Sequence, residues 1–220
     1  MPSIADLLTL GVLAFMAWRL AGAARVAMSG RGRARVATIV RGIRPRHLWP
    51  VPLVLAAVLG AALGLMALVP PLQYGWWTLL GGTGNPAFGS ATVTDGTVWA
   101  WLVPAAFVTM LVPALPLFAQ REEEIFRLGA ERRTRSQRWL RSLLFGLVHA
   151  VVGIPVGAAL ALSIGGAYFT HRYLREYHAT GSATEALLES TRAHTAYNGL
   201  IVAGALVVAV GVVLTHVLGS

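Results

Sequence analysis

The sequence contains neither cysteine nor lysine, and only nine of its 220 residues are acidic. The absence of cysteine excludes disulfides, thiolate metal sites, thiol catalysis and a lipid-modified cysteine anchor. Without lysine, all 18 basic residues are arginines, which give a formal net charge of +9. These arginines cluster beside apolar runs. We therefore expect no nucleic-acid partner and interpret them as topology signals that contact membrane lipids.

Charged residues are scarce overall, at 12% of the chain against about 25% in soluble domains. Hydrophobic residues make up 56%, and the mean hydropathy is +0.65. At about 20 residues per span, the chain has room for roughly six membrane-entering helices. We predict an all-α, polytopic transmembrane helix bundle in the plasma membrane. Abundant Ala, Gly and Arg without Lys suggest a GC-rich bacterial genome, and hence the bacterial inner membrane.

The distribution of arginine predicts the topology of the first half, because cytoplasmic loops are enriched in basic residues. The N-terminus has no basic segment before its apolar run, so we expect a retained first span and no cleavable signal peptide. The expected segments are a span over 4–28, an Arg-rich inside connector over 30–47, a span over 48–69 and an Arg-free outside loop over 71–98. This places the N-terminus outside.

Proline and glycine determine the expected course of the second half. Three prolines should kink or divide a span over 99–118, with a helix restarting just before Arg121. Gly153 and Pro155 should break the apolar run 143–169 near 151–155 and return the chain to the cytoplasmic side. We then expect a short amphipathic surface helix over 184–192 and a final span over 194–218.

The first polar cluster on these helices is Glu122, Glu123 and Glu124, followed by Arg127. Glu123 and Arg127 are spaced i,i+4, which suits an ion pair and leaves Glu122 on another face, free to point into the bundle. The alternative interpretation is a solvated run of charges at a helix end.

Two further polar pairs occur at helical spacing. Phe145 and His149 share one helix face, and His194 and Asn198 project together from the start of the last span. A buried histidine bonded to a carbonyl group, or a polar helix-packing pair, would explain these residues without catalysis.

Together, Glu122-Glu123-x-x-x-Arg127, Phe145-x-x-x-His149 and His194-x-x-x-Asn198 resemble the EExxxR, FxxxH and HxxxN/D motifs of the CAAX-protease and bacteriocin-processing (CPBP, or Abi) family, in the same order. The resemblance covers about residues 97–218. It divides the single membrane domain into N-terminal transmembrane helices and loops, 1–96, and a CPBP-like catalytic helical core, 97–220. Glu124 and Leu128 depart from the family pattern, which often has an apolar residue and a glycine at these places.

The resemblance implies an intramembrane endopeptidase near the cytoplasmic face. Glu122 would be the general base that activates water, assisted by His149, while His194 and Asn198 would stabilise the oxyanion. Glu123, Arg127 and Phe145 would support the site. The substrate would be a peptide or membrane protein, as the CAAX proteins are for family members.

Alternatives remain open at this point. No cofactor is expected, but a zinc ion held by Glu122, His149 and His194 is a second possibility, although no HExxH motif supports it. In a non-catalytic membrane scaffold or bacteriocin-immunity factor, the same polar residues would only hold the helices together by hydrogen bonds. Either way, the motif residues can meet only if the chain turns back near Pro155, because a straight span would separate them by about 30 Å.

Overall fold

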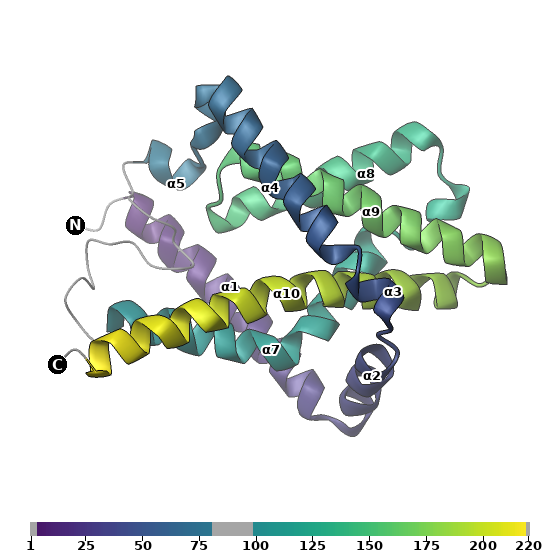
Figure 1. Ribbon diagram of the computed structural model, residues 1–220, viewed down its shortest axis with the longest axis horizontal. Helices are drawn as coiled ribbons and strands as arrows, with labels where there is room; N and C mark the ends of the chain where they lie inside the picture. Colours follow the sequence, from purple (N-terminus) through teal and green to yellow (C-terminus); the bar gives the residue numbers. More distant parts are fainter. Residues whose placement is uncertain (1–3, 81–98, 219–220) are drawn as a thin grey trace.

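The computed structural model describes residues 4–80 and 99–218, and these residues form helices and no strand (Figure 1). The predicted all-α fold is confirmed for this part of the chain. The elements are α1 (Ile4–Met28), α2 (Gly30–Arg41), α3 (Pro45–Leu48), α4 (Val51–Leu68), η1 (Pro70–Gln73), α5 (Trp76–Leu79), α7 (Trp99–Phe126), η2 (Ala130–Arg132), α8 (Arg135–Val148), η3 (His149–Val152), α9 (Val156–Thr180) and α10 (Ala183–Leu218).

The long helix α10 connects the two sides of the bundle, because it packs against both α7 and α9. Helix α9 in turn contacts α8 and α4, while α1 packs against α7 and α2. The main buried cluster combines Phe145 of α8, Phe169 of α9 and Tyr197 of α10 with smaller apolar side chains. Helices that are distant in sequence are thus held together by aromatic packing.

The predicted break near 151–155 is confirmed. Helix α8 ends at Val148, a 3-10 turn follows, and Gly153 adopts the left-handed conformation with φ of 85° before Pro155 caps α9. Glycine suits this φ because it has no Cβ to clash. Helix α9 then runs back along α8 so closely that a Cβ atom on Gly146 would collide with the carbonyl oxygen of Ala159.

Two described helices are long and apolar enough to cross a membrane. They correspond to Leu10–Met28 in α1 and Pro45–Leu68 in α3 and α4, close to the first two predicted spans. Both expose most of their apolar side chains. This exposure suits contact with lipid.

Two predicted helix boundaries, the restart of a helix just before Arg121 and the separate helix 184–192, were wrong. Helix α7 is undivided from Trp99 to Phe126 despite Pro104, Pro113 and Pro116, and neighbouring helices can support a proline-bearing helix of this kind. The expected surface helix 184–192 is the beginning of α10, because no Gly or Pro interrupts the sequence before Gly199. One face of the segment 184–192 is also buried.

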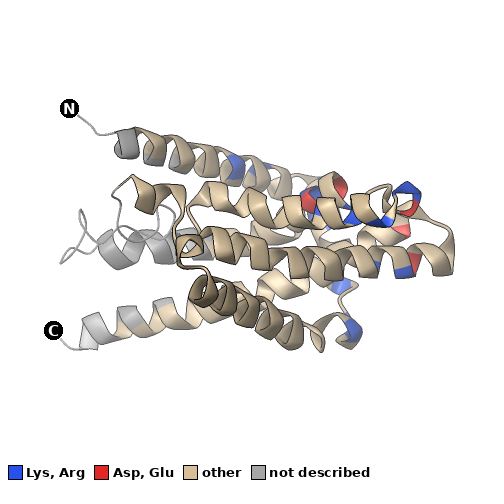
Figure 2. Ribbon diagram, turned by 90° about the horizontal axis from the view of Figure 1, so that it is seen from above, with Lys and Arg blue, Asp and Glu red and all other residues tan. Residues whose placement is uncertain are grey.

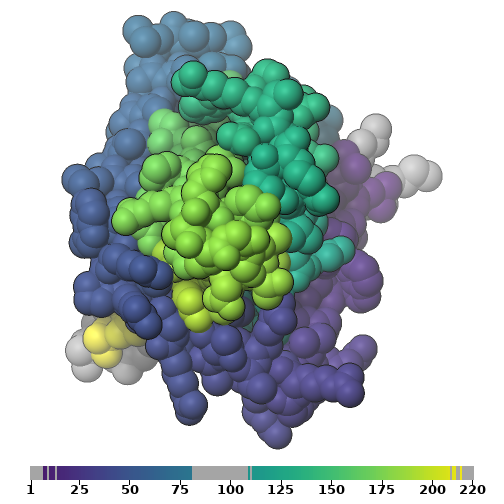
Figure 3. Space-filling view, turned by 90° about the vertical axis from the view of Figure 1, so that its right-hand side faces the viewer, coloured from purple at the N-terminus to yellow at the C-terminus, as the bar shows by residue number. Residues whose placement is uncertain are grey.

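Charged residues gather towards one end of the bundle, as Figure 2 shows for the described elements. The expected Arg-rich connector contributes to this end as a helix, α2, whose buried Ile39 opposes exposed arginines. Seen end-on, the turn from α9 to α10 lies at the centre of this surface, with α8 and the first helices around it (Figure 3). Most of the predicted outside loop and the proposed domain boundary at 96 lie outside the described residues.

Candidate active site

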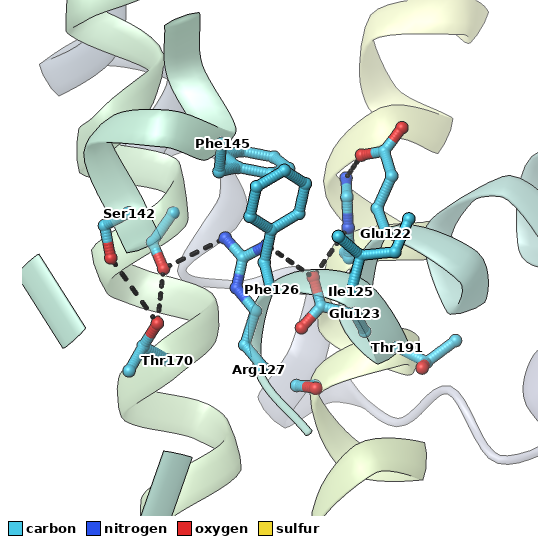
Figure 4. A network of polar contacts seen from close by, with 12 residues as sticks. Glu122, Glu123, Ile125, Phe126, Arg127, Ser142, Phe145, Thr170 and Thr191 are labelled. Atoms are coloured by element: carbon cyan, nitrogen blue, oxygen red, sulfur yellow. Dashed lines mark hydrogen bonds and ion pairs between the residues drawn. The ribbon is translucent and has the colours of Figure 1, made fainter. Parts of the chain in front are cut away.

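The C-terminal part of α7 carries the first motif, and its side chains point in different directions (Figure 4). Glu123 and Arg127 are fully buried, with 3.5 Å between Glu123 Oε1 and Arg127 Nη1, so the ion pair expected from their spacing is present. Glu122 is partly exposed, with 31% of its side chain accessible, while its Oε2 atom is buried. The helix therefore supplies one buried carboxylate and one accessible carboxylate at adjacent positions.

His194 of α10 lies between these two carboxylates. Its Nδ1 is 2.9 Å from Glu123 Oε1, and its Nε2 is 3.6 Å from Glu122 Oε2. An ionised carboxylate only accepts hydrogen bonds, so an ionised Glu123 requires the proton of the neutral imidazole to be on Nδ1. The lone pair on Nε2 then faces Glu122. This geometry joins the first and third motifs.

Aromatic rings surround the charged groups. Phe169 stacks on His194 at a centroid distance of 4.3 Å and an interplanar angle of 19°, and Phe145 meets the same imidazole edge-on at 5.5 Å. The guanidinium of Arg127 lies 4.1 Å from the centroid of the Phe145 ring. Cation–π contact is stronger away from water, so these rings stabilise Arg127 while they exclude solvent.

A backbone carbonyl of α9 anchors Arg127 from the other side. Arg127 Nη2 donates to the carbonyl oxygen of Gly166 at 3.1 Å, and the hydroxyl of Thr170 donates to the same oxygen at 2.9 Å (Figure 4). A Cβ atom at Gly166 would lie 3.0 Å from Phe145 and 3.1 Å from Arg127. The absence of a side chain at residue 166 therefore makes room for the motif residues.

His149 and Asn198 make fewer contacts with the other motif residues. His149 Nδ1 lies 2.8 Å from the carbonyl oxygen of Phe145, one helical turn earlier, and its ring meets the Phe145 ring at 5.1 Å. Phe145 thus contacts both motif histidines. Asn198 follows His194 by one turn of α10 and is half-buried. Within the described residues, no hydrogen bond or ion pair joins either side chain to Glu122.

The zinc alternative does not match this arrangement. In the described ranges, no three His, Cys, Asp or Glu side chains are placed to hold a metal ion. The Nδ1 contacts of His149 and His194 leave each Nε2 with its lone pair, but no third ligand group converges on them in the described residues. We therefore derive no catalytic step through a metal.

A second charged cluster is composed of Arg46 and His47 of α3, Arg172 of α9 and Glu189 of α10. His47 Nε2 and Arg46 Nη2 lie 2.9 Å and 2.8 Å from Glu189 Oε2, and Arg172 bonds the other carboxylate oxygen. His47 Nδ1 accepts the backbone N–H of Arg44, so Nε2 carries the proton and donates it to Glu189. This cluster ties α3 and α9 to α10.

Burial by itself would raise the pKa of Glu189. The hydrogen bond from His47 and the charges of Arg172 and Arg46 outweigh burial and lower this pKa to about 2. Glu189 is therefore ionised throughout the physiological pH range.

Several site residues were missed from the sequence. Phe169 and Gly166 belong to no motif, and only their i,i+3 spacing on one face of α9 hinted at a shared role. Glu189 was interpreted as part of a surface helix and Arg172 as a topology signal, although both side chains are buried. Charged residues among apolar neighbours were the available signal.

Comparison with protein-family models, curated proteins and solved structures finds no significant match to this chain. The resemblance to the CPBP family therefore depends on the motif residues themselves.

Proposed function

We propose that this protein is an intramembrane endopeptidase of the CPBP type, a polytopic bundle that hydrolyses a peptide bond near the charged end of its helices. The observation that carries the proposal is the position of His194 between Glu122 and Glu123, since it joins residues 71 positions apart in the sequence. A solvated run of charges at the end of α7 would require neither a buried Glu123 nor a histidine from another helix.

The proposed reaction uses Glu122 as the general base. Water adds its oxygen to the scissile carbonyl carbon while Glu122 takes one of its protons, and the carbonyl oxygen becomes an oxyanion. The C–N bond then breaks, and Glu122 returns the proton to the leaving amine. The partial exposure of Glu122 suits this role because water must reach it.

The two histidines and Asn198 would orient the attacking water and stabilise the oxyanion. His149 donates from Nδ1 to a carbonyl oxygen, which leaves Nε2 to accept a hydrogen bond from the attacking water. The Asn198 amide can donate to the oxyanion without changing its protonation. His194 can donate to the oxyanion only as imidazolium, because Glu123 already accepts the Nδ1 proton. Glu123, Arg127 and Phe145 position these groups and do not touch the substrate.

The test uses the purified full-length chain in liposomes, with two probes: a farnesylated CAAX peptide and a digest of bacterial membrane proteins. New peptide termini are identified by mass spectrometry. We expect the wild type to generate new termini and Glu122→Gln to lose at least about 10²-fold in rate, as for removal of a general base. Glu124→Gln is the matched control, because Glu124 is equally accessible but pairs with Arg121 on another side of α7.

Two outcomes would contradict the proposal. One is cleavage by Glu122→Gln at the wild-type rate. The other is a Glu122→Gln protein that folds and retains the full cellular phenotype, which would favour the non-catalytic scaffold or immunity factor. Zinc that copurifies in stoichiometric amount and is lost together with activity would replace the metal-free mechanism.

A further inference from the structure

A basic groove of about 760 Å³ lies between α1, α2 and α7, outside the site described above. Five arginines and a single glutamate line it, namely Arg19, Arg25, Arg31, Arg35, Arg121 and Glu124. Its volume is within the range of about 300–1,000 Å³ that is usual for small-ligand sites. An excess of positive charge in such a space attracts an anion.

The groove has more arginines than its own carboxylate can neutralise. Glu124 lies 3.2 Å from Arg121 and 4.0 Å from Arg35, and the nearby Gln120 accepts a hydrogen bond from Arg35 at 2.7 Å. Within the part of the chain that the structure describes, Arg19, Arg25 and Arg31 have no acidic partner. Arg25 and Arg31 are also exposed. Their guanidinium groups are free to bind phosphate oxygens.

The same groove is more apolar where it follows α1 back from Arg25 and Arg31, and Arg19 is the arginine that lines this part. Trp18, Gly22, Leu117 and Phe118 line this part, and the guanidinium of Arg19 lies 5.9 Å from the Phe118 ring. Arg25 is two turns beyond Trp18, about 10 Å along the helix axis. All of α1 from Leu10 to Met28 is apolar enough to lie in a membrane. The groove thus offers an apolar wall followed by a basic end.

We propose that this groove binds an anionic phospholipid, with the phosphate at Arg25 and Arg31 and an acyl chain along Trp18, Leu117 and Phe118. Basic pockets between membrane helices recognise anionic headgroups in this way. A free phosphate ion would use only the basic end and would leave the apolar wall without a ligand. Helix α7 carries Gln120, Arg121 and Glu124 in the groove and Glu122 and Glu123 in the candidate active site, so the lipid would bind beside the catalytic helix.

The experiment measures lipid binding by the purified full-length chain in a neutral detergent. Dioleoyl-phosphatidylglycerol, dioleoyl-phosphatidylcholine and inorganic phosphate are titrated separately, with native mass spectrometry and the thermal unfolding temperature as readouts. We expect one phosphatidylglycerol per chain and an increase in Tm, with neither effect from phosphatidylcholine or inorganic phosphate. Binding requires no hydrolysis, so Glu122→Gln protein should bind equally well even if the proposed protease activity is wrong.

Two variants test the groove itself. Arg25→Gln combined with Arg31→Gln should weaken phosphatidylglycerol binding about tenfold or more, because each arginine near an anionic lipid contributes about 1 kcal/mol. Gly22→Leu should also weaken phosphatidylglycerol binding without changing charge. A side chain at this position meets open space, so the leucine would occupy part of the groove that the acyl chain needs. The control is Arg135→Gln with Arg175→Gln, two exposed arginines outside the groove.

Each alternative outcome overturns the proposal. Equal binding of phosphatidylcholine would show that the groove does not require an anionic headgroup. An equal effect of inorganic phosphate would identify an anion site that binds no lipid. Equal loss in the control pair would indicate general surface attraction. Wild-type binding by both groove variants, with unchanged Tm in the absence of lipid, would place the lipid elsewhere.

Discussion

Glu123 and His194 are joined by a 2.9 Å contact between two buried side chains, one from α7 and one from α10. The same carboxylate oxygen also faces the guanidinium of Arg127. Glu123 therefore serves two partners at once, since it balances the charge of Arg127 and fixes the orientation of the imidazole. In the proposed mechanism, Glu123 is therefore a positioning residue, whereas the partly exposed Glu122 is the general base.

Replacing Glu123 by Gln should destabilise the protein by about 3–5 kcal/mol, because Arg127 would remain buried without a counter-charge. Denaturant or thermal unfolding in detergent measures the loss. Glu124→Gln should cost under about 1 kcal/mol, since its ion pairs are partly exposed. Equal stability of the two variants would mean that Arg127 finds another counter-charge.

Replacing Asn198 by Ala should reduce kcat about 10²–10³-fold, the usual cost of losing one oxyanion donor. Its stability should change little, because Asn198 makes no hydrogen bond within the described residues. Peptide cleavage and Tm are measured on the same preparation. An unchanged kcat would assign oxyanion stabilisation to other groups.

Replacing Gly146 by Ala should destabilise the protein by about 1–3 kcal/mol, because the added methyl group collides with the backbone of α9. Gly60→Ala in α4 is the matched control. A Cβ atom at Gly60 meets open space, so helix propensity should make that variant neutral or about 0.5–1 kcal/mol more stable. The difference in unfolding free energy between the two alanine variants is the quantity to compare.

Stability should fall at acidic pH through Glu189. Its pKa is about 2 in the folded protein against an ordinary value of 4.5, so the folded state binds fewer protons between these values. The stabilisation is fully present above pH 4.5 and is lost as pH falls towards 2. Unfolding measured across this window should show a shallower decline in Glu189→Gln than in the wild type.

Chelation should leave activity unchanged, because the donors of His149 and His194 do not converge with a third ligand. Peptide cleavage is measured before and after dialysis against 1,10-phenanthroline, which removes bound zinc. Loss of activity that added zinc restores would contradict the metal-free mechanism.

The sequence predicts the parts of this structure that depend on local signals. Helical spacing anticipates the Glu123–Arg127 pair, and Gly153 with Pro155 anticipates the turn that brings α9 back along α8. These features follow from residues close together in the chain, where backbone geometry is decisive. The turn also supplies the convergence on which the three-motif resemblance depends.

Features determined by packing between helices were less predictable. Prolines in α7 suggested a division that neighbouring helices override, and the charges of 184–192 suggested a surface helix, although Glu189 is buried against Arg172. Likewise, His194 was expected to stabilise the oxyanion, but nothing in the order of motifs indicates that its Nδ1–H donates a hydrogen bond to Glu123. Such partners come from distant segments, so local patterns do not specify them.

Because α10 is one continuous helix, its length relates the position of His194 to the thickness of a bilayer. At 1.5 Å per residue, this 36-residue helix is about 54 Å long, whereas the hydrocarbon core of a bilayer is about 30 Å thick. His194 lies about 16 Å from the start of the helix, which leaves about 36 Å beyond it. If that remainder spans the bilayer, the imidazole lies at the boundary of the hydrocarbon. For the proposed endopeptidase, the distance of a peptide bond from the membrane anchor of its substrate would then determine whether that bond reaches the site.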